Sequence, residues 1–158
     1  VIEKNAKMLG VPITVFESNI FDAVYEVENS PCYLCARMRR GFLYAKAQEL
    51  GCNKIALGHH RDDVLQTLLM NLVYEGRCES IPPMLQLAKM PIQFIRPLWS
   101  IDEQDIQTYA SLRAYRKQVK TCPFEKTTSR TKMAELLKEL ESMHVNVRSS
   151  LIHSLKVR

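Results

Sequence analysis

Two cysteines separated by two residues, Cys32 and Cys35, stand at the start of a predicted helix. The dipole and free N–H groups of a helix start favour the thiolate, which is the form of cysteine that binds metals or attacks disulfides. The pair alone fits a redox dithiol, half of a zinc site, part of an iron–sulfur ligand set, or two incidental core cysteines. Cys122 lies in a polar, basic segment before a proline, which is unusual for a core cysteine and favours a third ligand. Cys52 and Cys78 are interpreted as cysteines without a functional role.

A second candidate site is the hexapeptide GHHRDD at 58–63, which follows a predicted buried strand and precedes a helix. Ligands of open α/β sheets bind beyond the carboxyl ends of the strands, and Gly58 would let the backbone approach a ligand closely. Asp62 and Asp63 could cap the helix or hold Mg²⁺ beside phosphates. With the two histidines they could also form another metal site. The alternative is a structural turn in which one aspartate caps the helix and the histidines are exposed.

Hydrophobic periodicity predicts the elements that position these residues. In the first 75 residues we expect helices at 1–9, 20–29, 33–50 and 62–74 and strands at 12–16 and 54–58. This alternation predicts an α/β fold with a doubly wound parallel sheet. Beyond it we expect short strands at 84–88 and 92–95 and helices at 101–112, 129–143 and 145–155. The predicted organisation is a partial nucleotide-binding domain at 1–112 and a basic, mostly helical extension at 113–158.

Composition and charge narrow the class of protein. The 158 residues carry a formal charge of +5, and no run approaches the roughly 20 apolar residues that a membrane span needs. Residues 113–132 contain seven basic residues and one acidic residue, which indicates either an attraction for polyanions or a solvated basic surface. The odd number of cysteines, five, and the lack of a visible leader favour the reducing cytoplasm over a secreted disulfide scaffold.

Taken together, the string CYLCARMRRGFLYAKAQELGCNKIALGHHRDDVLQTLLMNL at 32–72 closely resembles the TtcA family, the tRNA 2-thiocytidine synthetases of the PP-loop ATPase superfamily. The resemblance continues through IPPMLQL and IRPL to the downstream Cys122. It implies a PP-loop fold and ATP-dependent thiolation of cytidine in tRNA. ATP would adenylate the C2 oxygen of the base, and sulfur would then displace AMP. A cysteine desulfurase is the implied type of sulfur donor, and a homodimer is compatible with the family.

The resemblance also implies roles for individual residues. Cys32, Cys35 and Cys122 would be the three ligands of a [4Fe–4S] cluster with one open iron. Among the nucleotide-binding residues, Arg39 would lie near the phosphates and Gly58 would place its backbone against the nucleotide. Asp63 would be an acidic residue near the reacting centre, with Mg²⁺ as its implied partner. His60 would be a neighbour of Asp63.

Two departures from the family pattern accompany the resemblance. The Ser-Gly-Gly-Lys-Asp-Ser pyrophosphate loop is not among these residues and is expected upstream of Val1. The chain as given is therefore expected to be an inactive fragment, with a degenerate relative of the family as the alternative. The second cysteine that many members carry near the third ligand is replaced in the run Pro123-Phe124-Glu125. Two other functions stay open: a sister PP-loop ATPase with another acceptor, and a non-catalytic RNA-docking module whose zinc is held by the three cysteines and His59 or His60.

Overall fold

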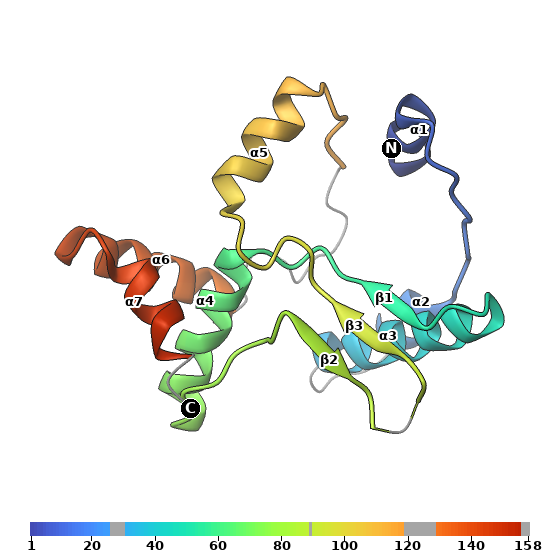
Figure 1. Cartoon of the computed structure of the whole chain (residues 1–158). Coiled ribbons are helices and arrows are strands. Elements are labelled where there is room, and N and C mark those ends of the chain that lie inside the picture. Colours follow the sequence, from blue (N-terminus) through green and yellow to red (C-terminus); the bar gives the residue numbers. More distant parts are fainter. Residues whose placement is uncertain (26–30, 89, 119–128, 156–158) are drawn as a thin grey trace.

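The computed structural model describes residues 1–25, 31–88, 90–118 and 129–155, apart from the side chains of residues 22 and 25. These residues form helices and short strands (Figure 1). None of the described helices is long and apolar enough to cross a membrane. The elements, in chain order, are α1 (Ile2–Leu9), α2 (Ile20–Tyr25), α3 (Pro31–Glu49), β1 (Lys54–Ala56), α4 (Arg61–Met70), the π-helical turn η1 (Asn71–Glu75), β2 (Met84–Gln86), β3 (Gln93–Ile95), α5 (Glu103–Leu112), α6 (Ser129–Met143) and α7 (Val147–Ser154).

The described sheet has three strands in the order β1-β3-β2. β1 pairs with β3 in parallel, with Ile55 opposite Phe94, whereas β2 pairs with β3 antiparallel, with Leu85 opposite Phe94. The α/β prediction is therefore confirmed, but the described sheet is mixed rather than wholly parallel. The connections explain the difference. A short loop joins β2 to β3 and makes a hairpin, while the chain from β1 to β3 passes through α4, as a parallel pair requires.

The strand predicted at 12–16 is wrong, because the structure has no strand there. This segment runs as an extended connection from α1 to α2, away from the sheet (Figure 1). Its apolar side chains, Val11, Ile13, Val15 and Phe16, are exposed. High β-propensity describes a side chain that suits a half-buried pleated surface, and among the described residues this segment has no neighbouring strand to pair with.

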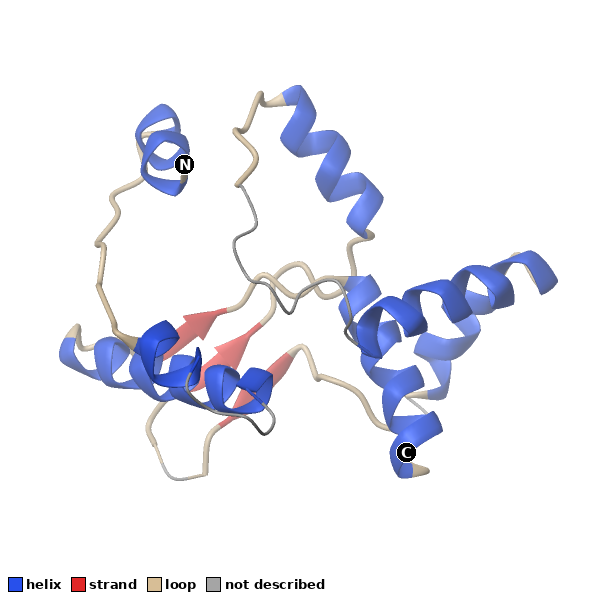
Figure 2. Ribbon diagram, turned by 180° about the vertical axis from the view of Figure 1, so that it is seen from behind, coloured by secondary structure: helices blue, strands red, loops and turns tan. Residues whose placement is uncertain are grey.

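Two groups of apolar contacts hold the elements together. On the sheet, Ile92 is fully buried, and the rings of Tyr44 on α3 and Phe94 on β3 lie 5.4 Å apart, so α3 covers one face (Figure 2). Beyond the end of the sheet, α4 packs against α6 and α7. The core of this second group consists of Leu65, Leu69, Met133 and Leu137. The sheet and the C-terminal helices are thus joined through α4.

Candidate functional site

The turn between β1 and α4 contains the predicted 58–63 motif. His60 is the N-cap of α4, and its backbone N–H donates to the Asp63 Oδ2 atom at 3.1 Å. The Nε2 atom of its ring lies 3.5 Å from the same oxygen. Asp63 thus caps the helix from the third helical position, which fixes the direction in which the chain enters α4.

Asp62 has a different role from its neighbour. Its Oδ1 atom accepts a hydrogen bond from Arg148 at 2.6 Å, and its Oδ2 atom accepts one from the backbone N–H of Glu103 at 2.8 Å. Burial acts to raise the pKa of this carboxyl, but the hydrogen bonds from Arg148 and Glu103, together with nearby positive charge, hold the pKa below its ordinary value. Both oxygens therefore serve structure, and the start of α5 is satisfied by Asp62 rather than by a side chain of its own loop.

Arg148 on α7 links four elements. Its guanidinium donates to Asp62, to Asp102 at 3.0 Å and to Glu141 at 2.7 Å. Asp102 also accepts from Arg61 at 2.9 Å, so two guanidinium groups share one carboxylate. Although burial lowers it, the pKa of Arg148 is raised on balance by these carboxylates. The starts of α4 and α5 and the helices α6 and α7 are therefore tied together by one ionic network.

His59 occupies the other side of the turn. Burial lowers the pKa of its ring, and the positive charges of Arg96 and Arg130 lower it further, against the opposing effect of Asp63. Its Nδ1 atom is buried without a hydrogen-bond partner among the described residues. Arg96 is itself buried and donates to the carbonyl of Pro82 at 2.6 Å. We therefore expect His59 to be neutral at neutral pH.

Two of the three predicted cysteine ligands lie near the start of α3. Cys32 stands in its first turn and Cys35 about one turn later, Cys32 exposed and Cys35 half-buried. Pro31 is the first helical residue, where its missing N–H costs nothing. The first turn of α3 lies at the same end of the sheet as the carboxyl ends of β1 and β3 (Figures 1 and 2). Cys122 lies outside the described residues, and among the residues that are described no three His, Cys, Asp or Glu side chains gather in a metal site.

The remaining predicted residues are accessible. Arg39 is exposed one turn after Cys35. Gly58 is exposed, and a Cβ atom added there would meet nothing within 4 Å, so the space beside this backbone is open. The Oδ1 atom of Asp63 lies 3.4 Å from Arg130 on α6. Arg130, which follows Cys122 by eight positions in the sequence, therefore contacts this turn.

The sequence interpretation missed Arg148 and Asp102, which form the network, and Trp99, which lies beside it. Arg148 lies 46 positions from Asp102 and 86 positions from Asp62 along the chain. Local sequence spacing does not indicate pairs that are so far apart. The sole signal was chemical: adjacent acidic residues at 62 and 63 exceed what one helix cap needs.

Comparison of the sequence with known proteins identifies the family of this chain. The profile of the PP-loop domain matches residues 1–118. The chain belongs to the PP-loop domain family. This PP-loop chain is 36% identical, over 98% of its length, to a tRNA-cytidine(32) 2-sulfurtransferase from Anaeromyxobacter dehalogenans, of which it covers 55%. It is 41% identical over 79% of its length to the protein of the same name from Legionella pneumophila, of which it covers 44%.

The PP-loop chain thus spans about half the length of the curated relatives it matches. Among solved structures, it is similar to the U34-tRNA thiolase NcsA from Methanococcus maripaludis with its [4Fe–4S] cluster. The TM-score is 0.79 at 22% identity, and the match covers 98% of this chain and 54% of that one. At this level of identity the likeness shows a shared fold.

Proposed function

We propose that this PP-loop chain takes part in ATP-dependent thiolation of cytidine in tRNA, as the sulfurtransferase part that carries an iron–sulfur cluster. The observation that carries the proposal is the extent of the similarity: it runs over 98% of the chain, through both the cysteine helix and the turn after β1. The tRNA, the cysteine desulfurase as sulfur donor and a cytoplasmic location belong to the same proposal.

Three cysteine thiols are a donor set that a [4Fe–4S] cluster accepts. Cys32 and Cys35 lie about one turn apart near the start of α3, and we assign Cys122 as the third ligand. Three thiolates leave one iron of a [4Fe–4S] cluster without a protein ligand. When bound, such a cluster would supply an open iron at which sulfur is held. The three cysteines would hold that cluster.

We assign the nucleotide to the open side of that turn. Gly58 leaves space for a nucleotide to approach the backbone, and Arg39 would meet its phosphates. Asp63 would place one carboxylate near the reacting centre, with His60 holding it through the backbone N–H. Mg²⁺ usually takes one or two carboxylates and completes its coordination with phosphates and water, so Asp63 alone would suffice.

In the proposed reaction the C2 oxygen of cytidine attacks the α-phosphorus of ATP and pyrophosphate leaves. A hydrosulfide, released from the donor's persulfide by a thiol reductant, then attacks C2. The C2–O bond breaks, AMP leaves with the oxygen, and loss of a proton leaves the thiocarbonyl. The protein contributes position and charge stabilisation near the phosphates. These 158 residues contain no Ser-Gly-Gly-Lys-Asp-Ser run, so we expect them alone not to turn over ATP.

Anaerobic reconstitution with iron and sulfide tests the cluster. We expect broad absorption at about 400 nm and about four irons per chain. Cys122→Ser should abolish iron retention and leave the helical circular dichroism unchanged. Cys52→Ser is the matched control, because Cys52 is an exposed cysteine outside the assigned ligand set, and it should retain the iron. A colourless chain with one tightly held zinc, or a loss of fold in Cys122→Ser, would contradict the proposal and favour a structural zinc module.

Nucleoside analysis tests the acceptor. The chain, joined to a segment that supplies the missing pyrophosphate loop and loaded with its cluster, should form 2-thiocytidine in tRNA when given ATP and a sulfur donor. A different thiolated nucleoside would replace cytidine as the acceptor and leave the cluster assignment intact.

A further inference from the structure

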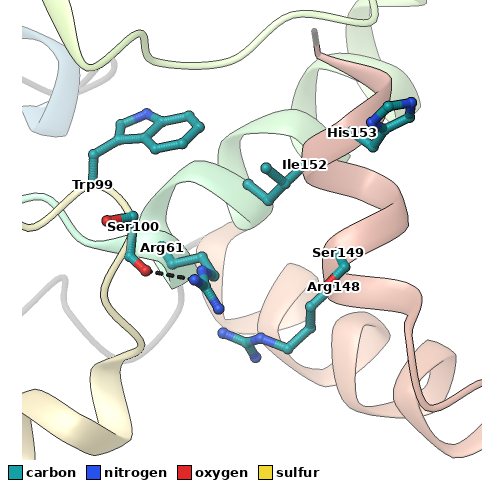
Figure 3. A pocket seen from close by; sticks show the side chains of 7 residues that line it. All are labelled: Arg61, Trp99, Ser100, Arg148, Ser149, Ile152 and His153. Carbon is teal, nitrogen blue, oxygen red and sulfur yellow. Dashed lines mark hydrogen bonds between the residues drawn. The ribbon is translucent and has the colours of Figure 1, made fainter.

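Two arginines near the turn at 58–63 are engaged within the fold. Arg61 donates to the carbonyl of Ser100 at 2.6 Å and to Asp102 at 2.9 Å. Figure 3 shows the first of these bonds, with Arg148 extending toward Arg61 from α7. Arg148 itself donates to three carboxylates. The charge of both guanidinium groups is therefore balanced, and the positive charge that is free for a ligand lies on α3.

Three arginines of α3, at positions 37, 39 and 40, are exposed and form no ion pair with any residue that the structure describes. Within that part of the chain their side chains make one hydrogen bond, from the Arg40 Nε atom to the carbonyl of Ala36 at 3.2 Å. The sequence has no acidic residue from 29 to 48, so the helix supplies no carboxylate to them. Like charges at neighbouring positions on a helix repel one another. These cations therefore do not help the helix to fold, and they are available to an anion.

Helical spacing separates the three arginines into two groups. Arg39 follows Cys32 by seven positions and Cys35 by four, so it shares the face of α3 that carries the cysteines. At 100° per residue, Arg37 and Arg40 are turned about 80–160° away from the two cysteines. Thiolates at the cysteines can therefore balance the charge of Arg39, whereas the charges of Arg37 and Arg40 stay free.

Arg37 and Arg40 lie on the face of α3 that looks toward the sheet. They precede Tyr44 by seven and four positions, which is one helical face, and the rings of Tyr44 and Phe94 lie 5.4 Å apart. Arg40 lies about 6 Å and Arg37 about 10 Å from the level of Tyr44, toward the start of the helix. Because β3 ends at Ile95, one residue after Phe94, both arginines extend past the carboxyl end of the sheet, where ligands of α/β sheets bind.

Tyr33 lies on the same face, four positions before Arg37 and seven before Arg40. It is 65% exposed. An exposed aromatic ring in line with cations is how proteins hold unpaired nucleotides, the ring for a base and the cations for the phosphates. The stripe of Tyr33, Arg37 and Arg40 is about 10 Å long and open to solvent. Because sites for small molecules are concave pockets, this open stripe favours a nucleic acid strand over a mononucleotide.

We propose that the stripe of Tyr33, Arg37 and Arg40 binds the RNA strand beside the acceptor base, with one base stacked on Tyr33 and backbone phosphates on the two arginines. The inference rests on the proposed function and deepens it, because it names the surface that holds the RNA. The stripe lies at the same end of the sheet as the turn at 58–63, so a strand bound along it would bring a neighbouring nucleotide to that turn.

The anisotropy of a short fluorescein-labelled single-stranded RNA, titrated with the 158-residue chain, measures this binding. Arg37→Gln combined with Arg40→Gln should weaken the binding about tenfold, because each close pair of unit charges in water is worth about fivefold before salt screening. The slope of log affinity against log salt concentration should become shallower by about 1.4, since each phosphate contact of a single strand contributes about 0.7. A wild-type chain that does not bind this RNA at low salt would overturn the inference.

Lys138→Gln is the matched control. It removes one positive charge at an exposed position of α6. Glu135 and Glu141 each lie three positions from Lys138, so carboxylates of its own helix surround this charge. The affinity and the salt slope of the control should stay near those of wild type. Equal affinities of the control and the double arginine variant for RNA would refute the stripe.

Urea unfolding separates RNA binding from a structural role of the arginines. Because Arg37 and Arg40 repel each other, the double variant should keep the urea midpoint of wild type or raise it. A clearly lower midpoint would mean that the arginines stabilise the fold, against the inference. Tyr33→Ala should weaken RNA binding about fivefold, and Tyr33→Phe, which keeps an aromatic ring, should stay within about twofold of wild type. Equal losses in these two variants would contradict stacking on Tyr33.

ATP binding and iron retention distinguish this inference from the proposed function. If the double arginine variant loses affinity for ATP but not for RNA, the arginines serve the nucleotide and the inference is wrong. A chain that holds its cluster but binds RNA equally well with and without the two arginines would refute the stripe and leave the proposed function standing. RNA binding that depends on the stripe, in a chain that never retains iron, would support the stripe and contradict the cluster.

Discussion

Replacing Arg148 by Met removes the centre of the ionic network and keeps most of the aliphatic packing of the side chain. Arg148 donates to Asp62 at 2.6 Å, to Asp102 at 3.0 Å and to Glu141 at 2.7 Å. Asp102 keeps its bond to Arg61, and Asp62 keeps the Glu103 N–H. The principal loss is therefore the charge partner of Asp62, whose side chain is 15% exposed.

The size of the effect follows from this burial. Breaking a fully buried ion pair costs about 3–5 kcal/mol, and an exposed pair is worth about 0–1 kcal/mol. Asp62 lies between these limits and nearer the first, whereas Asp102 and Glu141 are about one-third exposed. We expect Arg148→Met to lower the free energy of unfolding by about 2–3 kcal/mol at neutral pH. The control Arg77→Met, which breaks an exposed pair with Glu75, should cost less than about 0.5 kcal/mol.

The stability difference between wild type and Arg148→Met should change with pH in a defined direction. The folded state lowers the pKa of Asp62, so its contribution to stability is complete above the ordinary aspartate pKa and is lost as the pH falls through the lowered value. The difference between wild type and Arg148→Met should therefore be constant from about pH 5 to 7 and shrink below about pH 4. Urea unfolding followed by circular dichroism at these pH values measures it.

A double-mutant cycle identifies the partner. If Arg148 acts mainly through Asp62, then Arg148→Met together with Asp62→Asn should cost about 1–2 kcal/mol less than the sum of the two single changes. This account of the network would be refuted if Arg148→Met lowered the free energy of unfolding to within about 0.5 kcal/mol of the Arg77→Met control. It would also be refuted if the stability difference between wild type and Arg148→Met grew toward acid pH.

Three further predictions concern the core and two of the glycines. Leu65→Ala should cost about 2–5 kcal/mol in urea unfolding, because Leu65 is fully buried between α4 and α6, whereas Leu112→Ala, at an 81% exposed position, should cost less than about 0.5 kcal/mol; similar costs would mean that this core is not packed as described. Gly51→Ala should cost about 1 kcal/mol, because Gly51 has a φ of 66°. Gly58→Ala should leave stability nearly unchanged, since its surroundings are open, but should weaken nucleotide binding in calorimetry if the nucleotide lies against this backbone; unchanged nucleotide affinity would remove Gly58 from the site.

The sequence predicted the elements whose periodicity is strong and local. The helix predicted at 33–50 is α3 (Pro31–Glu49), and the two short strands predicted between prolines are β2 and β3. The helix predicted at 62–74 ends as α4 at Met70 and continues as the π-helical turn η1 to Glu75. Hydrophobic spacing does not distinguish an α-helical turn from a π-helical one, because a single wider turn leaves the apolar residues on nearly the same face.

Pairing and long-range bonds could not be predicted in the same way. The residues at 12–16 have the composition of a strand, but a strand exists only where a neighbour offers its backbone groups. The antiparallel direction of β2 depends on how tightly the loop before β3 turns. For the candidate site, the sequence indicated the residues of the turn at 58–63 but not that Asp62 would bond to Glu103 and Arg148. The assembly of Cys122 with the other two cysteines, and the boundary at 112, stay predictions.

The two kinds of contact on α4 constrain the turn at 58–63 in different ways, and both come from the C-terminal helices. Apolar packing of Leu65 and Leu69 against α6 fixes how far α4 lies from its neighbours, but hydrophobic contact has little directional preference. A small rotation of α4 about its own axis would redirect the side chains of Asp62 and Asp63 at little cost in that contact. The directional hydrogen bonds from Arg148 oppose this rotation. Displacing α7 should therefore shift the turn at 58–63 before it unfolds the sheet.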